Sequence, residues 1–256
     1  MQNIAFLFFV FLVLTENSFS QKTDSIKASN HFGGAITLTT KGISTIPSFT
    51  LGKPAVLFDM SIGKRRLSFE PQFRFSLEGK PWTFIFWWRY KLLTTDKFQI
   101  SVGTHPALNF RTEVVVSNGV SKKVIVARRY LAAELAPNYV LAKNITIGLY
   151  YLYSRGLDKD ATRNTHFIGI RSSFSSNLSS QYFIRFIPQF YYLKTDKPYG
   201  FYINPTLTLA KKNFPFSISS IVNKALKTDI PGKSFLWNIS LIYSFNKEYV
   251  EMPQPF

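Results

Sequence analysis

The chain has 256 residues, of which 31 are Lys or Arg and only 14 are Asp or Glu, so its formal net charge is +17. It contains no cysteine, which excludes disulfides, thiolate catalysis and cysteine-ligated zinc, and its three histidines argue against a histidine-rich metal site. Hydrophobic residues make up 46% of the chain and aromatic residues 17%, a composition that excludes intrinsic disorder. We therefore expect a folded protein with neither a cofactor nor a bound metal.

The N-terminus carries a predicted export signal. Residues 4–14 are eleven consecutive apolar residues, which suits the hydrophobic region of a signal peptide and is shorter than the ~20 residues of a membrane-spanning helix. Ser18-Phe19-Ser20 then forms a small-x-small cleavage pattern. The segment has no Lys or Arg, so a buried N-terminal strand or helix is the alternative. We expect a signal peptide at residues 1–20 and a periplasmic segment at residues 21–33.

The rest of the chain alternates between apolar and polar residues, which is the pattern of strands with one apolar face. In residues 67–77, every odd position is Leu, Phe or Pro and every even position is polar. Three other segments repeat this period clearly, namely 82–92, 182–192 and 235–245. Weaker versions lie at 34–41, 54–62, 97–104, 122–141, 145–154, 164–174, 199–210 and 214–226. The sequence thus predicts twelve strands.

Three all-β architectures fit twelve amphipathic strands: a β-sandwich, a closed calyx such as a lipocalin, and a transmembrane barrel. The apolar phase of the four clearest strands contains no charged residue, and Arg129, Lys211 and Lys224 occupy that phase only near strand ends. Strands of about 9–11 residues cross a bilayer. We therefore predict an all-β, transmembrane, antiparallel up-and-down β-barrel over residues 34–246 and a periplasmic tail over 247–256. Because proline lacks a ladder donor, we expect bulges at Pro71, Pro188 and Pro205.

The connections between the strands alternate in length. Tight turns are expected around residues 64–65, 94–96, 142–144, 176–178 and 211–213, and most of the others are longer. Short turns are typical of the periplasmic end of such barrels, so both chain ends are placed there. In the connection 105–121, Asn118-Gly119 between two valine-rich runs predicts a hairpin that extends its strands above the membrane. The alternative is that this connection folds inward and narrows the barrel.

The last strand has the features of an assembly signal. It contains Trp237 and Tyr243 and ends at Phe245, and it resembles the aromatic-ending β-signal of outer-membrane barrels, although eleven residues follow it. Over residues 30–249 the chain resembles porin-like outer-membrane proteins of Bacteroidota-type bacteria. That resemblance implies export to a Gram-negative outer membrane and recognition by the barrel-assembly machinery, and it supplies no catalytic motif.

Candidate catalytic residues are sparse. A barrel hydrolase needs a nucleophile, a base and an orienting group close together. The nearest pattern is His105 followed by Ser117-Asn118-Gly119, and it is more simply a loop histidine and a turn. His166 near Asp158 and Asp160 is weaker still, and His31 precedes the first expected strand. We therefore predict no enzyme and no catalytic residue, with a lipid hydrolase as the remote alternative.

The polar phase of the strands predicts the lumen. Its ionisable residues are Asp59, Glu70, Arg74, Arg89, Lys91, Arg128, Glu134, Arg171 and Arg185. Six of these are basic and three are acidic, and rings of Arg and Lys favour anions. The sequence predicts a narrow passive pore for small, anion-biased solutes. The alternative is a plugged structural or adhesive barrel in which the acids pair with arginines.

The remaining positive charge has a simpler partner than nucleic acid. Basic residues lie in the expected external loops and their flanks, at Lys53, Lys80, Lys122, Lys123, Arg155, Lys159, Arg163, Lys197, Lys227 and Lys233. In an exported barrel, the nearest counter-charges are the phosphates of outer-membrane lipid and lipopolysaccharide. We expect outer-membrane lipid and lipopolysaccharide to be the partners of these basic residues.

Overall fold

The computed structural model describes residues 29–117 and 120–250. The predicted signal peptide, residues 21–28 of the predicted periplasmic segment, the Asn118-Gly119 turn and residues 251–256 lie outside the described residues. None of the helical segments in the described part of the chain has the length and hydropathy of a membrane-spanning helix.

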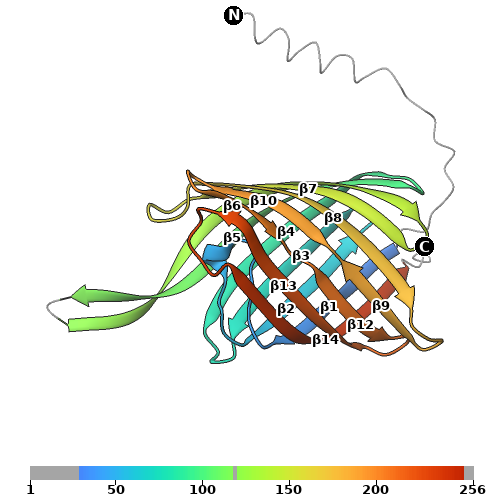
Figure 1. Ribbon diagram of the computed structural model, residues 1–256, viewed down its shortest axis with the longest axis horizontal. Helices are drawn as coiled ribbons and strands as arrows, with labels where there is room; N and C mark the ends of the chain where they lie inside the picture. The colour runs from blue at the N-terminus through green and yellow to red at the C-terminus, as the bar shows by residue number, and fades with distance from the viewer. Residues whose placement is uncertain (1–28, 118–119, 251–256) are drawn as a thin grey trace, which may run out of the picture.

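The described residues form one antiparallel sheet that closes on itself (Figure 1). In chain order, its strands are β1 (Ser29–Thr39), β2 (Ala55–Lys64), β3 (Leu67–Ser76), β4 (Pro81–Thr94), β5 (Phe98–Ser117), β6 (Val120–Ala142), β7 (Ile145–Gly156), β8 (Asn164–Asn177), β9 (Tyr182–Ile187), β10 (Gln189–Thr195), β11 (Tyr199–Ile203), β12 (Thr206–Lys211), β13 (Phe216–Thr228) and β14 (Phe235–Val250). Neighbours in the chain pair as hairpins, except β9 with β10 and β11 with β12, and β14 pairs with β1 to close the barrel.

Two pairs of these elements each occupy one position in the barrel. β9 and β10 are separated by Pro188 and both pair with β8, while β11 and β12 are separated by Asn204 and Pro205 and both pair with β13. The fourteen elements therefore form a barrel of twelve strand positions, which confirms the predicted fold class.

Two strands are interrupted at a proline. The proline has no N–H to donate to the neighbouring strand, but its carbonyl still accepts a hydrogen bond from that strand. The Pro188 carbonyl accepts from the amide of Ser172, and the Pro205 carbonyl accepts from the amide of Val222. The strands are interrupted at Pro188 and Pro205. The expected bulges are nevertheless absent there, because the pairing with β8 and with β13 keeps one register on both sides of each proline. The expected bulge at Pro71 is wrong: β3 continues through it, and the ladder to β2 keeps one register on both sides.

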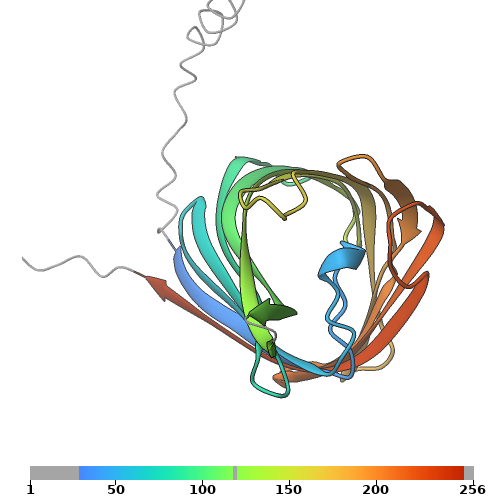
Figure 2. The same cartoon turned by 90° about the vertical axis from the view of Figure 1, so that its left-hand side faces the viewer.

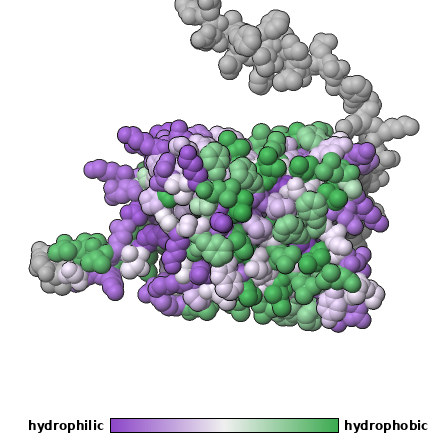
Figure 3. All heavy atoms as spheres, viewed as in Figure 1, coloured by the Kyte–Doolittle hydropathy of each residue, from purple (hydrophilic) through white to green (hydrophobic). Residues whose placement is uncertain are grey.

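On the side of the barrel drawn in Figure 3, apolar side chains predominate in the middle and hydrophilic ones gather towards the ends. Large side chains on the predicted lipid-facing phase stand about half exposed, such as Trp88 at 48% and Trp237 at 49%. An apolar surface of this extent in a monomer marks a contact with an apolar environment. The outward band matches the lipid-facing surface of transmembrane barrels.

Several element bounds differ from the sequence-based expectation. β1 begins at Ser29, before the expected start at residue 34, and β14 continues to Val250, into the expected tail. The connection 105–121 is strand on both sides, with one register from the Phe98–Tyr139 pair to the Ser117–Val120 pair. This long hairpin projects beyond the barrel (Figure 1), so the predicted extension is confirmed and the inward-folding alternative is wrong.

Candidate functional site: the barrel lumen

The connection between β1 and β2, residues 40–54, folds into the barrel; we call it the lumen loop (Figure 2). Its one helical turn is η1 (Pro47–Phe49). The indole N–H of Trp82 on β4 donates to the Phe49 carbonyl over 2.7 Å, and the Phe49 ring meets the Tyr130 ring edge-on with centroids 5.1 Å apart. The Arg111 guanidinium on β5 donates to the carbonyls of Ser48 and Thr50.

The opposite wall holds the same loop. The Tyr191 hydroxyl on β10 donates to the Thr45 carbonyl over 2.8 Å. Ile46 packs against a buried cluster formed by Phe167, Tyr191, Leu193, Tyr202 and Ile230. β4 and β10 lie five positions apart around the twelve-position barrel. The lumen loop therefore spans the interior from one wall to nearly the opposite one and narrows it.

Trp82 faces the lumen, although its phase predicts a lipid-facing side chain. The register between β3 and β4 shifts between Arg74 and Phe75, and beyond this bulge Trp82 turns inward, where it is 1% exposed. A bulge of this kind moves a side chain to the other face of the sheet. A Cβ on Gly42 would lie 2.9 Å from the Trp82 ring, so the glycine lets the loop approach the indole.

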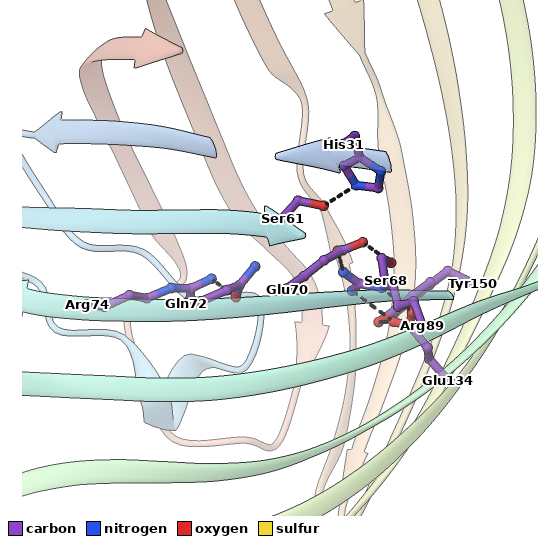
Figure 4. Close-up of polar contacts among 9 residues, drawn as sticks. All are labelled: His31, Ser61, Ser68, Glu70, Gln72, Arg74, Arg89, Glu134 and Tyr150. Carbon is purple, nitrogen blue, oxygen red and sulfur yellow. Dashed lines mark hydrogen bonds and ion pairs between the residues drawn. The ribbon is translucent and has the colours of Figure 1, made fainter. Parts of the chain in front are cut away.

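An ion-paired network crosses one wall of the lumen (Figure 4). Arg89 Nε lies 2.6 Å from Glu134 Oε1, and Arg89 Nη1 pairs with Glu70 Oε2. The Tyr150 hydroxyl donates to Glu134 over 2.5 Å, and the Ser68 hydroxyl donates to Glu70 over 2.7 Å. The Glu134 side chain is only 2% exposed, so its charge depends on these partners.

Gly103 lets this network cross β5. It is the register partner of both Arg89 on β4 and Glu134 on β6. A Cβ at this position would lie 2.9 Å from Glu134 Oε1 and 3.1 Å from Arg89 Cγ. The missing side chain therefore leaves the space in which the ion pair forms above an intervening strand.

A cavity of about 340 Å³ lies in the lumen, and the lumen loop forms part of its lining. Its polar wall residues include Gln72, Arg74, Arg89, Asn109, Arg171 and Gln189, and its aromatic ones Trp82, Trp87, Tyr130, Tyr150 and Phe167. Arg74 Nη2 donates to Gln72 Oε1 over 2.8 Å, whereas the buried Arg74 Nε has no acceptor. Within the described residues, neither Arg74 nor Arg171 has a carboxylate within 4.0 Å.

The other predicted pore-lining residues lie outside this cavity. Arg128 pairs with Glu113 over 2.5 Å at the base of the projecting hairpin, and Lys91 is exposed near the tight turn after β4. Arg185 lines a separate depression beside the turn between β12 and β13. Asp59 Oδ1 is buried without a hydrogen-bond partner. The predicted set therefore divides into a group around the cavity and four residues elsewhere.

The histidines do not assemble the catalytic arrangement that a hydrolase needs. His105 is a buried residue of β5, which corrects its expected place in a loop, and its ring centroid lies 4.0 Å from that of Trp87. His166 Nδ1 bonds the Tyr151 hydroxyl over 3.0 Å, while Asp158 bonds Arg129.

His31 is the one histidine of the described part that bonds a serine. It belongs to β1, which corrects its expected place before the first strand, and its Nε2 lies 2.9 Å from Ser61 Oγ. No hydrogen bond in the described residues orients its other ring nitrogen, so the third member of a triad is missing there. Residues 29–117 and 120–250 also contain no group of three or more His, Asp or Glu that could hold a metal ion.

Comparison with known proteins concerns the fold. The sequence matches no family model and no curated protein. Among solved structures it is similar to the KdgM porin, with a TM-score of 0.51 and 10% identity over 84% of this chain and 99% of that chain. The chain has the β-barrel fold of that porin. It is also similar to the COG4313 outer membrane channel from Pseudomonas putida F1, with a TM-score of 0.49 and 10% identity over 86% and 96% of the two chains.

Sequence reasoning missed three parts of this porin-like lumen: the lumen loop, Trp82 and Gly103. Gly103 occupies a lumen-facing position of its strand between two residues with larger side chains on the same face. An isolated glycine in a strand indicates that other atoms approach the backbone closely there. That signal was available in the sequence. The inward turn of Trp82 had no local signal, because it depends on a register shift against β3.

Proposed function

We propose that this protein is an outer-membrane pore for the passive diffusion of small solutes, with a bias toward anions. Its closed barrel, its apolar outer face and its similarity in fold to a porin support the location and the class. The ends of the barrel pair at Ser29 and Val250, at the end where the tight turns lie, and we place this end in the periplasm.

The proposed anion bias rests on where the lumen charges are neutralised. Arg89 is held by two glutamates and Arg128 by one, so these arginines carry little free charge into the lumen. Arg74 and Arg171 line the cavity with no carboxylate within 4.0 Å in the described residues, and Asp59 acts on Arg74 only from a greater distance. Positive groups in a narrow, low-dielectric passage concentrate anions and repel cations.

Planar-bilayer conductance under a salt gradient tests this function. We expect single-channel currents and a reversal potential of the sign that anion preference gives. The double variant Arg74→Gln/Arg171→Gln should reduce this preference. A matched control, Lys211→Gln/Lys224→Gln, removes the same charge from the apolar phase of the wall and should leave the reversal potential unchanged. Cation preference in the native protein would refute the charge argument.

The alternative function is a plugged structural or adhesive barrel, and the lumen loop favours it specifically. This loop is held by both walls and packs on a buried apolar cluster, which is how a closed interior is filled. Absence of any conductance, from protein shown to be folded by heat-modifiable migration on a gel, would decide for this alternative.

We further propose that the protein is not an enzyme and that its surface partners are outer-membrane lipid and lipopolysaccharide. The missing third group at His31 supports the first statement, and the basic external residues support the second. Lipase, deacylase or protease activity that is lost on His31→Ala or His105→Ala would overturn the non-enzymatic assignment.

A further inference from the structure

We propose that the lumen cavity is a preformed binding site for a small organic anion that carries one acidic group beside a flat apolar ring. This inference rests on the proposed pore function only in placing the cavity on a solute path. The site itself follows from three features of its walls: guanidinium groups without an ion-pair partner within 4.0 Å, an unsatisfied buried donor, and an aromatic lining. Each feature sets one property of the ligand.

The charge of the site requires an anion. Arg74 and Arg171 enter the cavity wall from β3 and β8, and no carboxylate lies within 4.0 Å of either in the described residues. Arg89, the third arginine of the wall, is already held by Glu70 and Glu134 and does not compete for the ligand. Asp59 acts electrostatically on Arg74 from beyond this distance and forms no ion pair with it. The two guanidinium groups therefore keep N–H donors for one carboxylate, sulfonate or phosphate, which arginine binds through paired N–H donors.

Arg74 leaves a specific place for the acidic group. Its Nη2 donates to Gln72, which fixes the guanidinium, and its Nε is buried with no acceptor. A buried donor without a partner is unfavourable, and an incoming anion oxygen removes that cost. The guanidinium also lies 5.7 Å from the centre of the Trp82 ring, so a group bound to Arg74 lies beside an indole.

The aromatic walls require an apolar, flat part of the ligand. Trp82 and Trp87 are both buried in the wall, at 1% and 5% exposure, and Tyr150 and Phe167 line the same space. A hydrated inorganic ion gains nothing from this aromatic lining, whereas the ring of an organic anion interacts favourably with aromatic neighbours beyond the burial of its own surface. The volume of about 340 Å³ is at the small end of ligand pockets, which suits a single-ring molecule.

Quenching of tryptophan fluorescence by 4-nitrobenzoate tests the site in the folded, detergent-solubilised protein. The nitro group is an efficient quencher, and Trp82 and Trp87 line the cavity, while Trp88 and Trp237 stand on the outer face. We expect saturable quenching by 4-nitrobenzoate and only weak, non-saturating quenching by neutral 4-nitrobenzamide. Trp87→Phe should remove part of the saturable quenching and leave the part that comes from Trp82, and Trp82→Phe/Trp87→Phe should remove it entirely.

The charge variants supply the matched comparison. Loss of one charge-assisted contact corresponds to roughly a tenfold weaker affinity, so Arg74→Gln should raise the dissociation constant about tenfold. Arg185→Gln removes the same charge from a wall position outside the cavity and should change it less than about twofold. If Arg74→Gln does not fold, Arg171→Gln takes its place.

Three outcomes would overturn the site. They are equal saturable quenching by the amide, equal effects of Arg74→Gln and Arg185→Gln, and competition by sodium nitrate as strong as competition by benzoate. Conductance without saturable binding would refute this inference and leave the pore intact. Saturable binding without conductance would refute the pore and leave the site intact.

Discussion

The Arg89 network allows a quantitative test of the lumen as a folded unit. Arg89→Met removes the charge and keeps an apolar side chain of similar length, so Glu70 and Glu134 lose their shared partner. Glu134 is 2% exposed, and among the described residues its carboxylate keeps a hydrogen bond from the Tyr150 hydroxyl alone. Breaking a buried pair by removing one partner destabilises proteins by about 3–5 kcal/mol. Arg89 itself is 27% exposed, so we expect a loss near the lower limit, about 3 kcal/mol.

Urea-induced unfolding in lipid vesicles measures this loss, and a second substitution isolates its cause. Glu134→Gln removes the buried charge and keeps the size of the side chain and an acceptor for the Tyr150 hydroxyl. The double variant Arg89→Met/Glu134→Gln should therefore be more stable than Arg89→Met alone, because no uncompensated buried charge remains at residue 134. If Arg89→Met loses less than about 1 kcal/mol, or if the two losses simply add, the network does not act as we argue.

Gly103→Val places a branched side chain where the ion pair crosses β5, so we expect a smaller folded fraction, measured by heat-modifiable migration on a gel. A folded fraction equal to that of the native protein would show that the network can move aside. Because Arg129 donates hydrogen bonds to Asp158, the pKa of that carboxyl lies below its ordinary value of 3.8. The pair therefore stabilises the fold above pH 3.8 and loses this effect as the pH falls through the lowered pKa, and an NMR titration midpoint at or above 3.8 would contradict it. Phe245→Ala should lower the yield of assembled barrel in cells, whereas Phe235→Ala at the other end of β14 should not, and equal yields would remove the assembly role.

The alternation of side chains was sufficient to predict the barrel. A strand with one apolar face has period two whatever its partners are, so twelve strand positions and their inward phase could be inferred locally. Trp82 escaped this reasoning because its direction depends on a register shift against β3. The three prolines show the same limit. Pro188 and Pro205 interrupt their strands and β3 passes Pro71 without interruption, but the register is unchanged at all three prolines, so none of the bulges expected from the missing donor is formed.

The functional consequence of the lumen charges also depends on pairing that the sequence does not contain. By composition, the predicted lumen has six basic and three acidic residues. In the fold, two of these acids form ion pairs with Arg89, and Arg128 forms an ion pair with Glu113, a residue outside the predicted set. Arg74, which the more distant Asp59 also influences, and Arg171 line a cavity that the lumen loop helps to form. The positive charge that attracts an anion is therefore concentrated at one place in the lumen, between aromatic walls. From this local placement we expect selective binding of particular anions more than a general preference for negative charge.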